Sequence, residues 1–202
     1  MQVLRRRDMN NLLALDNKMH GVKPLATTDI LINAVLFQIC WFTAVLAGGF
    51  WAILPVSLML AHYLMAMRPA SLLILCLLAG FGIFIDSIYL SLHVYDFAES
   101  PVIPLLNLPV WLACLWLAFC LSLPVSLAWL VRKPYFFVLA CAVFGPLSYL
   151  AGRHWQVVNF ADHEVVLLAL EWSVFSIVAI VLLKARSAES FEPDTASGND
   201  KV

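Results

Sequence analysis

The sequence predicts an all-α integral membrane protein, a bundle of about six transmembrane helices with both termini in the cytoplasm. Of its 202 residues, 63% are hydrophobic and only 12% are charged, and the mean hydropathy is +0.91. Soluble domains are about half apolar and about a quarter charged. Six apolar runs follow one another along the chain, each of roughly the 20 residues that a helix needs to cross a bilayer. Lys and Arg are scarce, so no nucleic-acid partner is expected.

Each apolar run is bounded by residues that turn the chain or begin a helix. Gly48-Gly49 permits a tight turn after the first run, and Arg68-Pro69 and Arg132-Lys133-Pro134 each combine a charge with a helix-starting proline. Polar connections cover 96–104 and 153–164. The expected spans are 30–48, 50–67, 71–93, 109–131, 135–152 and 165–183. Pro124 and Pro146 fall inside two of these spans and should kink them, leaving the carbonyls of Cys120 and Ala142 without their helical partners.

Two polar tails flank this transmembrane domain. We assign the domain to 29–184 and expect both 1–28 and 185–202 to be disordered, because they hold too few apolar residues to pack. With six spans, nearly all Lys and Arg residues fall on the side of the two tails, and only Arg153 falls on the other. The positive-inside rule therefore places both tails in the cytoplasm. Five crossings with a re-entrant second segment is the main alternative.

Two acidic residues within apolar runs, Asp86 and Glu171, mark the candidate site. A charge at the centre of a membrane helix costs about 2.5–3.5 kcal/mol on insertion scales, so it usually has a partner or a function. In the six-span topology both carboxyls lie at similar depth in the outer half, where Arg153, Gln38 and Tyr149 supply further polar groups. If the helix faces meet, one carboxyl is protonated or Arg153 neutralises the pair. In the structural alternative, Asp86 ties helices together and Glu171 pairs with Arg153.

Other residues that often carry chemistry are interpreted as structural. The five cysteines lie in apolar runs without metal-ligand spacing, so neither a metal nor a cofactor is expected. No catalytic motif is present, which leaves enzyme activity open. Trp116 and Trp172 should fill helix junctions. Because Trp172 directly follows Glu171, we expect it to face another direction and to lie outside the site.

Several stretches between about 33 and 183 carry a resemblance to a known family. They are Phe37-Gln38 with Trp41, Ile85-Asp86-Ser87, Leu115-Trp116 through Leu127-Ala128-Trp129-Leu130, Gly145-Pro146-Leu147-Ser148-Tyr149-Leu150-Ala151-Gly152, and Leu170-Glu171-Trp172. In these stretches the chain resembles an uncharacterised bacterial family of small multi-pass inner-membrane proteins, known as a domain of unknown function. Where the family carries a polar pair, this chain has Pro124-Val125. The resemblance implies a bacterial inner (plasma) membrane protein connected with envelope lipid metabolism.

These observations leave three functional hypotheses. The first is an accessory or binding protein for a lipid or an amphipathic small molecule, with membrane lipids and a second copy or an envelope enzyme as partners. The second is a small proton-coupled transporter that uses the same carboxyls, although no internal repeat supports it. The third is a lipid-modifying membrane enzyme with Asp86 or Glu171 as general base.

Overall fold

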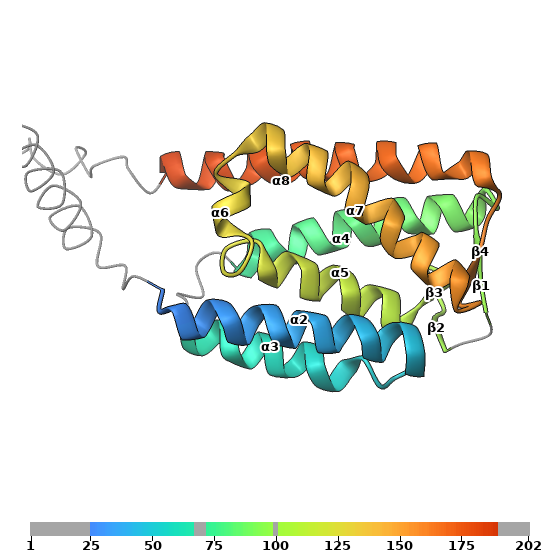
Figure 1. Ribbon diagram of the computed structural model, residues 1–202, viewed down its shortest axis with the longest axis horizontal. Helices are drawn as coiled ribbons and strands as arrows, with labels where there is room; N and C mark the ends of the chain where they lie inside the picture. Colours follow the sequence, from blue (N-terminus) through green and yellow to red (C-terminus); the bar gives the residue numbers. More distant parts are fainter. Residues whose placement is uncertain (1–24, 67–71, 99–100, 190–202) are drawn as a thin grey trace, which may run out of the picture.

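The computed structural model describes residues 25–66, 72–98 and 101–189, and these form a helical bundle (Figure 1). Short strands occur only in its connections: β1 (Asp96–Phe97) pairs with β4 (Val158–Asn159), and β2 (Val102–Ile103) pairs with β3 (Leu108–Pro109), both antiparallel. The helices are α2 (Thr27–Ala47), α3 (Ile53–Ala66), α4 (Leu72–Ser91), α5 (Val110–Ser122), α6 (Ala128–Val131), α7 (Pro134–His154) and α8 (Val165–Glu189), with a 3-10 turn η2 (Asp162–Glu164) before α8.

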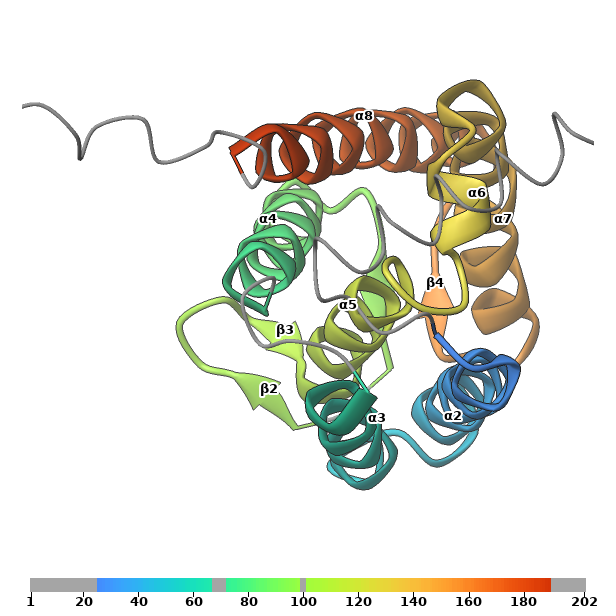
Figure 2. The ribbon, with the colours of Figure 1, turned by 90° about the vertical axis from the view of Figure 1, so that its left-hand side faces the viewer.

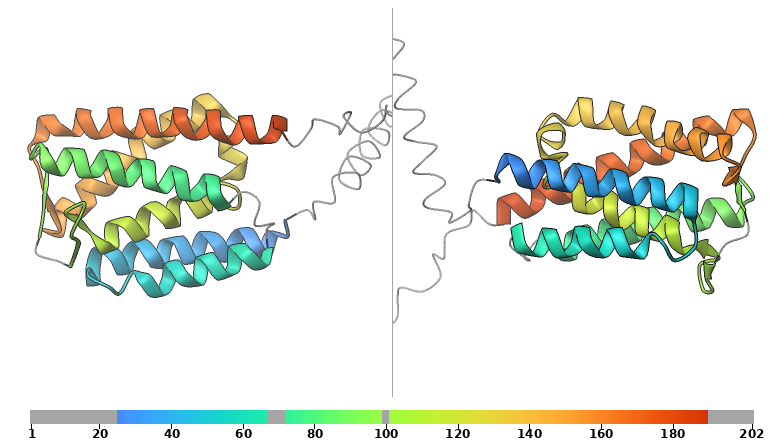
Figure 3. Two further views of the ribbon diagram at one scale, coloured as in Figure 1. Left: turned by 180° about the vertical axis from the view of Figure 1, so that it is seen from behind. Right: turned by 60° about the horizontal axis from the view of Figure 1, so that its bottom comes forward.

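Helix α5 occupies the middle of the bundle, as the end-on view shows (Figure 2). It packs against α2, α3 and α4, while α8 packs against α4 and, most extensively, against α7. The start of α2 and the end of α8 lie at one end of the bundle, and the paired strands lie at the other (Figures 1 and 3). The polar connections that contain the strands therefore lie at the end of the bundle away from the start of α2 and the end of α8.

Four helices, α2, α4, α7 and α8, are long and apolar enough to cross a membrane. Helices α3 and α5 are equally apolar, but with 14 and 13 residues they are shorter than the ~20 residues that a crossing usually takes. Large apolar side chains cover the outside of the bundle, as lipid contact requires. A multi-pass, all-α membrane protein is thus confirmed, while the count of six crossings stays a prediction.

The fourth expected span, 109–131, is not one continuous helix. Helix α5 ends at Ser122 and α6 begins only at Ala128, because Pro124 has no N–H for the helical ladder. The Cys120 carbonyl is satisfied by the Leu123 N–H at 3.2 Å. Helix α7, by contrast, continues through Pro146 without a break.

The ends of the bundle differ slightly from the expected domain bounds. Helix α2 begins at Thr27, where the Asp29 side chain accepts a hydrogen bond from the Ala26 N–H at 3.3 Å. Helix α8 continues beyond 184 to Glu189, because alanine, arginine and glutamate in this stretch favour helix. The expected disorder of the tails otherwise falls on 1–24 and 190–202, outside the described residues.

Two connections between helices are fixed by left-handed backbone conformations. Gly48 and Gly49 have φ values of 60° and 54°, which confirms the predicted glycine turn between α2 and α3. After α4, His93 has a φ of 54°, and the Val94 N–H bonds back to the Tyr89 carbonyl at 3.0 Å. This reversal returns the chain to the bundle at Tyr95, which is buried.

Candidate functional site: a buried acidic pair beside an aromatic cavity

Asp86 lies at the junction of three helices and one connection, with none of its surface exposed. Its carboxyl accepts hydrogen bonds from the Tyr149 hydroxyl at 2.8 Å, from the Tyr95 hydroxyl and from the Trp116 indole N–H. These donors come from α7, from the segment after α4 and from α5. Three donors on two carboxylate oxygens are well suited to stabilise a buried negative charge.

Tyr95 reaches this carboxyl because the chain reverses just beyond α4. The phenol is almost fully buried and also contacts the rings of Tyr149 and Phe97. Burial, and next the neighbouring Asp86 carboxylate, raise the pKa of the Tyr95 phenol well above its ordinary value. Tyr95 therefore remains a hydrogen-bond donor throughout the physiological pH range.

Glu171 lies next to Asp86 but in a very different environment. Its side chain, from α8, is only 2% exposed. Its carboxyl is within interaction range of the Asp86 carboxyl, but neither of its oxygens has a hydrogen bond of standard geometry among the described residues. The structure thus brings together the two acidic residues singled out from the sequence and gives hydrogen-bond donors to only one of them.

Arg153 does not join this pair. Its guanidinium donates hydrogen bonds to the Asp162 carboxylate at 2.8 Å and the Phe160 carbonyl at 3.1 Å, and it lies 4.7 Å from the centre of the Phe160 ring. The structural alternative, in which Arg153 pairs with Glu171, is therefore wrong, and Arg153 does not neutralise the acidic pair. The side chain stays 33% exposed at the end of α7, where pairing with Asp162 avoids the desolvation that a place beside Glu171 would require.

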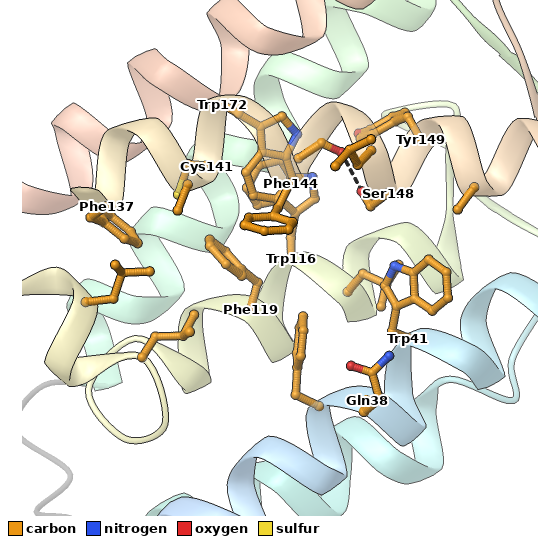
Figure 4. Close-up of a pocket in the computed structure, with 18 of the residues that line it drawn as sticks. Gln38, Trp41, Trp116, Phe119, Phe137, Cys141, Phe144, Ser148, Tyr149 and Trp172 are labelled. Carbon is orange, nitrogen blue, oxygen red and sulfur yellow. Dashed lines mark hydrogen bonds between the residues drawn. The ribbon is translucent and has the colours of Figure 1, made fainter. Parts of the chain in front are cut away.

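Trp116 and Tyr149, which donate to Asp86, also line a cavity of about 480 Å³. The cavity lies between α2, α5, α7 and α8 (Figure 4). Gln38 lines it from α2, so Gln38 and Tyr149 share this cavity. Among the described residues, no hydrogen bond joins Gln38 to Asp86 or Glu171. The lining is mainly aromatic and aliphatic: Phe37, Gln38, Trp41, Leu112, Leu115, Trp116, Phe119, Leu127, Leu130, Phe137, Ala140, Cys141, Phe144, Gly145, Leu147, Ser148, Tyr149, Ala151 and Trp172.

Trp172 belongs to the wall of this cavity, and as expected it faces another direction than Glu171 and makes no hydrogen bond to the acidic pair among the described residues. Its ring stacks on that of Trp116, with centroids 5.0 Å apart and planes 17° apart. Although Glu171 and Trp172 are adjacent in sequence, the 100° step along α8 lets one face the Asp86 carboxyl while the other covers Trp116. Two glycines make room for these rings.

The glycines are Gly82 on α4 and Gly145 on α7. A Cβ on Gly82 would lie 2.3 Å from the Trp116 ring, and one on Gly145 would lie 2.2 Å from the Trp172 ring. The missing side chain at Gly82 thus makes room for the Trp116 indole. Trp116 is thereby held with its N–H on Asp86 and its ring against the cavity.

The fold and the site define a class: a multi-pass helical membrane protein with a buried acidic pair behind an aromatic-lined cavity. Within that class, residues 30–178 match the family described as "Protein of unknown function (DUF2878)". The chain therefore belongs to this family, which confirms the resemblance to a domain of unknown function. Neither a curated protein nor a solved structure matches the chain.

Proposed function

We propose that this protein binds a lipid, or another largely apolar molecule, in the cavity between α2 and α7. The observation that carries the proposal is the cavity itself: its volume is about 480 Å³, within the range of roughly 300–1,000 Å³ typical of ligand sites. Apolar and aromatic side chains form nearly all of its wall. A predominantly apolar ligand fits such a wall, because it leaves few polar groups unsatisfied.

The polar groups of the cavity favour a ligand with one small polar part. The Ser148 hydroxyl is already bonded to the Gly145 carbonyl at 2.7 Å, and the Tyr149 hydroxyl is bonded to Asp86. Gln38, which is exposed, keeps its amide for a ligand. An ester or amide carbonyl would suit this group, as in a lipid at the start of its acyl chain.

The cavity lies where a membrane molecule can reach it from the side. Helix α2 packs on α3 and α5, whereas α7 packs on α8 and α6, and the cavity lies between α2 and α7. Phe144 and Leu147 line it and are also exposed on the outside of the bundle. We place the entrance between α2 and α7, facing the lipid.

Replacement of Ala140 by phenylalanine is expected to abolish most of the ligand binding. Ala140 lines the cavity, so the larger ring would occupy space that the ligand needs. The measurement is native mass spectrometry of protein exchanged into a detergent, which detects bound molecules by mass. We expect the unmodified chain to retain an apolar molecule and A140F to lose it.

Leu139→Phe provides the matched control, because Leu139 is the neighbouring residue on α7 and is 61% exposed. L139F should retain the same molecule as the unmodified chain. Retention by A140F equal to that of L139F, in proteins with the same helical content, would contradict the proposal. So would the absence of any retained molecule from all three proteins.

The proposal includes six crossings of a bacterial inner membrane, with both termini in the cytoplasm and with membrane lipids as partners. A second copy or an envelope enzyme would complete the assembly in lipid metabolism. The alternation of the apolar helices and the side-to-side distribution of Lys and Arg support this arrangement. The shorter α3 and α5 would cross as parts of the bundle, each packed against neighbouring helices.

Leu105→Cys tests the orientation in a chain whose native cysteines have been replaced. Leu105 is 92% exposed in the connection between β2 and β3, at the end of the bundle opposite the described chain ends. A membrane-impermeant maleimide should label it in intact cells. Lys133→Cys, at the other end and also exposed, should be labelled only after the membrane is opened. The reverse pattern would contradict cytoplasmic termini.

A proton-coupled transporter is the second candidate, and one observation favours it. Two carboxyls, Asp86 and Glu171, are buried together among apolar helices. Carboxyls in such positions commonly carry protons in membrane transporters. In this function the cavity would hold the transported molecule. Transport into proteoliposomes that follows an imposed pH gradient, and stops in Glu171→Gln, would favour this candidate over a binding protein.

A further inference from the structure

The two buried carboxyls differ sharply in the hydrogen bonds that they receive. Asp86 accepts bonds from Tyr95, Trp116 and Tyr149, whereas Glu171 accepts none of standard geometry in the described part of the chain. Hydrogen bonds to a carboxylate favour its charged form, and burial without them disfavours it. The arrangement therefore suits a charge on Asp86 and a neutral acid at Glu171.

Among the described residues, no cationic side chain forms an ion pair with Asp86 or Glu171. The ion pairs among the described residues join His62 to Asp29, His93 to Asp96 and Arg153 to Asp162, all away from the acidic pair. The other titratable groups that interact with the pair are phenols, Tyr89, Tyr95 and Tyr149, from α4, the segment after it and α7. Two adjacent carboxylates would repel each other in this surrounding, and one proton removes that repulsion.

We propose that Asp86 and Glu171 form a site that binds one proton inside the helix bundle, with the charge on Asp86 and the proton on Glu171. The Glu171 hydroxyl then donates toward the Asp86 carboxylate, the group within its interaction range. The site needs no ligand in the cavity to hold its proton. In a transporter, this site would carry the coupled proton. In a binding protein, it would lie behind the cavity wall.

The same side chains form the proton site and the cavity wall. Trp116 and Tyr149 each line the cavity and donate to Asp86. A movement of either ring on ligand entry would change the number of donors on the charged carboxylate. The proton on Glu171 is therefore positioned to respond to the cavity, although its presence does not depend on a ligand.

Infrared spectroscopy of the full chain in lipid bilayers tests the proposal. At neutral pH, surface carboxyls are ionised, so the carbonyl-stretch band of a protonated carboxylic acid should come from the buried site. We expect this band to shift when glutamate is labelled with carbon-13 at the side-chain carboxyl and to stay in place when aspartate is labelled. It should disappear in Glu171→Gln and persist in Glu164→Gln, a control in the turn η2 before α8.

The isotope labels decide the question in the unmodified protein, so the result does not depend on whether a variant folds. A band that shifts with labelled aspartate would overturn the assignment, because Asp86 would then carry the proton. No protonated-acid band at neutral pH would overturn the site altogether. Since no cavity ligand is needed for these spectra, the proton site and the lipid-binding function can fail separately.

Discussion

Replacement of Asp86 by alanine is expected to lower the free energy of unfolding by at least about 3 kcal/mol, because three buried hydrogen-bond donors would lose their acceptor. Tyr95, Trp116 and Tyr149 all donate to this carboxyl, and alanine would leave three buried donors without an acceptor. Each such donor costs about 1–3 kcal/mol. The measurement is thermal unfolding in detergent, followed by circular dichroism.

Two further variants show whether the loss comes from these hydrogen bonds. Asp162→Ala removes an exposed carboxylate that pairs with Arg153, and surface ion pairs contribute at most about 1 kcal/mol. The unfolding temperature of Asp86→Asn should lie between those of D86A and D162A. The asparagine amide keeps one oxygen acceptor but places an additional N–H donor among the three existing donors. If D86A unfolds at the same temperature as D162A, the three donors find other acceptors and Asp86 does not organise the bundle.

The helices were largely predictable because their limits depend on local chemistry. Pro134 begins α7, and Gly48 with Gly49 turns the chain after α2, as their backbone preferences dictate. The break between α5 and α6 was not predicted, because a proline alone does not show whether a helix breaks: α7 continues through Pro146. The difference depends on tertiary contacts, among them the bond from the Ser126 hydroxyl to Asn33 at 2.6 Å.

The candidate site was predictable only at positions where the sequence places an acidic residue within an apolar helix, because burial of a charge there costs free energy. Asp86 and Glu171 are conspicuous in apolar helices, and the structure places them together. Tyr95 and Trp172 are ordinary residues for a membrane protein, so nothing local distinguishes them as members of the site. Arg153 was misplaced because its partner, Asp162, lies in the polar connection before α8, whose path the hydropathy pattern does not specify.

Gly82→Ala should destabilise the protein, whereas Gly80→Ala on the same helix should not. A Cβ at Gly82 would lie 2.3 Å from the Trp116 ring, so the indole must move; nothing lies within 4 Å of a Cβ at Gly80. Overpacking of this kind costs about 1–3 kcal/mol. Loss of the Trp116 bond to the Asp86 carboxylate adds about 1.5–3 kcal/mol. Unfolding temperature in detergent, and tryptophan fluorescence for the moved ring, measure the effect.

Gly145→Ala separates the packing of the rings from the hydrogen bond. Its Cβ would lie 2.2 Å from Trp172, which stacks on Trp116 but whose own indole N–H has no partner among the described residues. G145A should therefore carry the packing cost alone and destabilise less than G82A. An equal loss in both variants would mean that the stacked pair of rings, and not its bond to Asp86, holds α4, α5 and α8 together. If G82A proves as stable as G80A, Trp116 has space to move and does not fix Asp86 against the cavity wall.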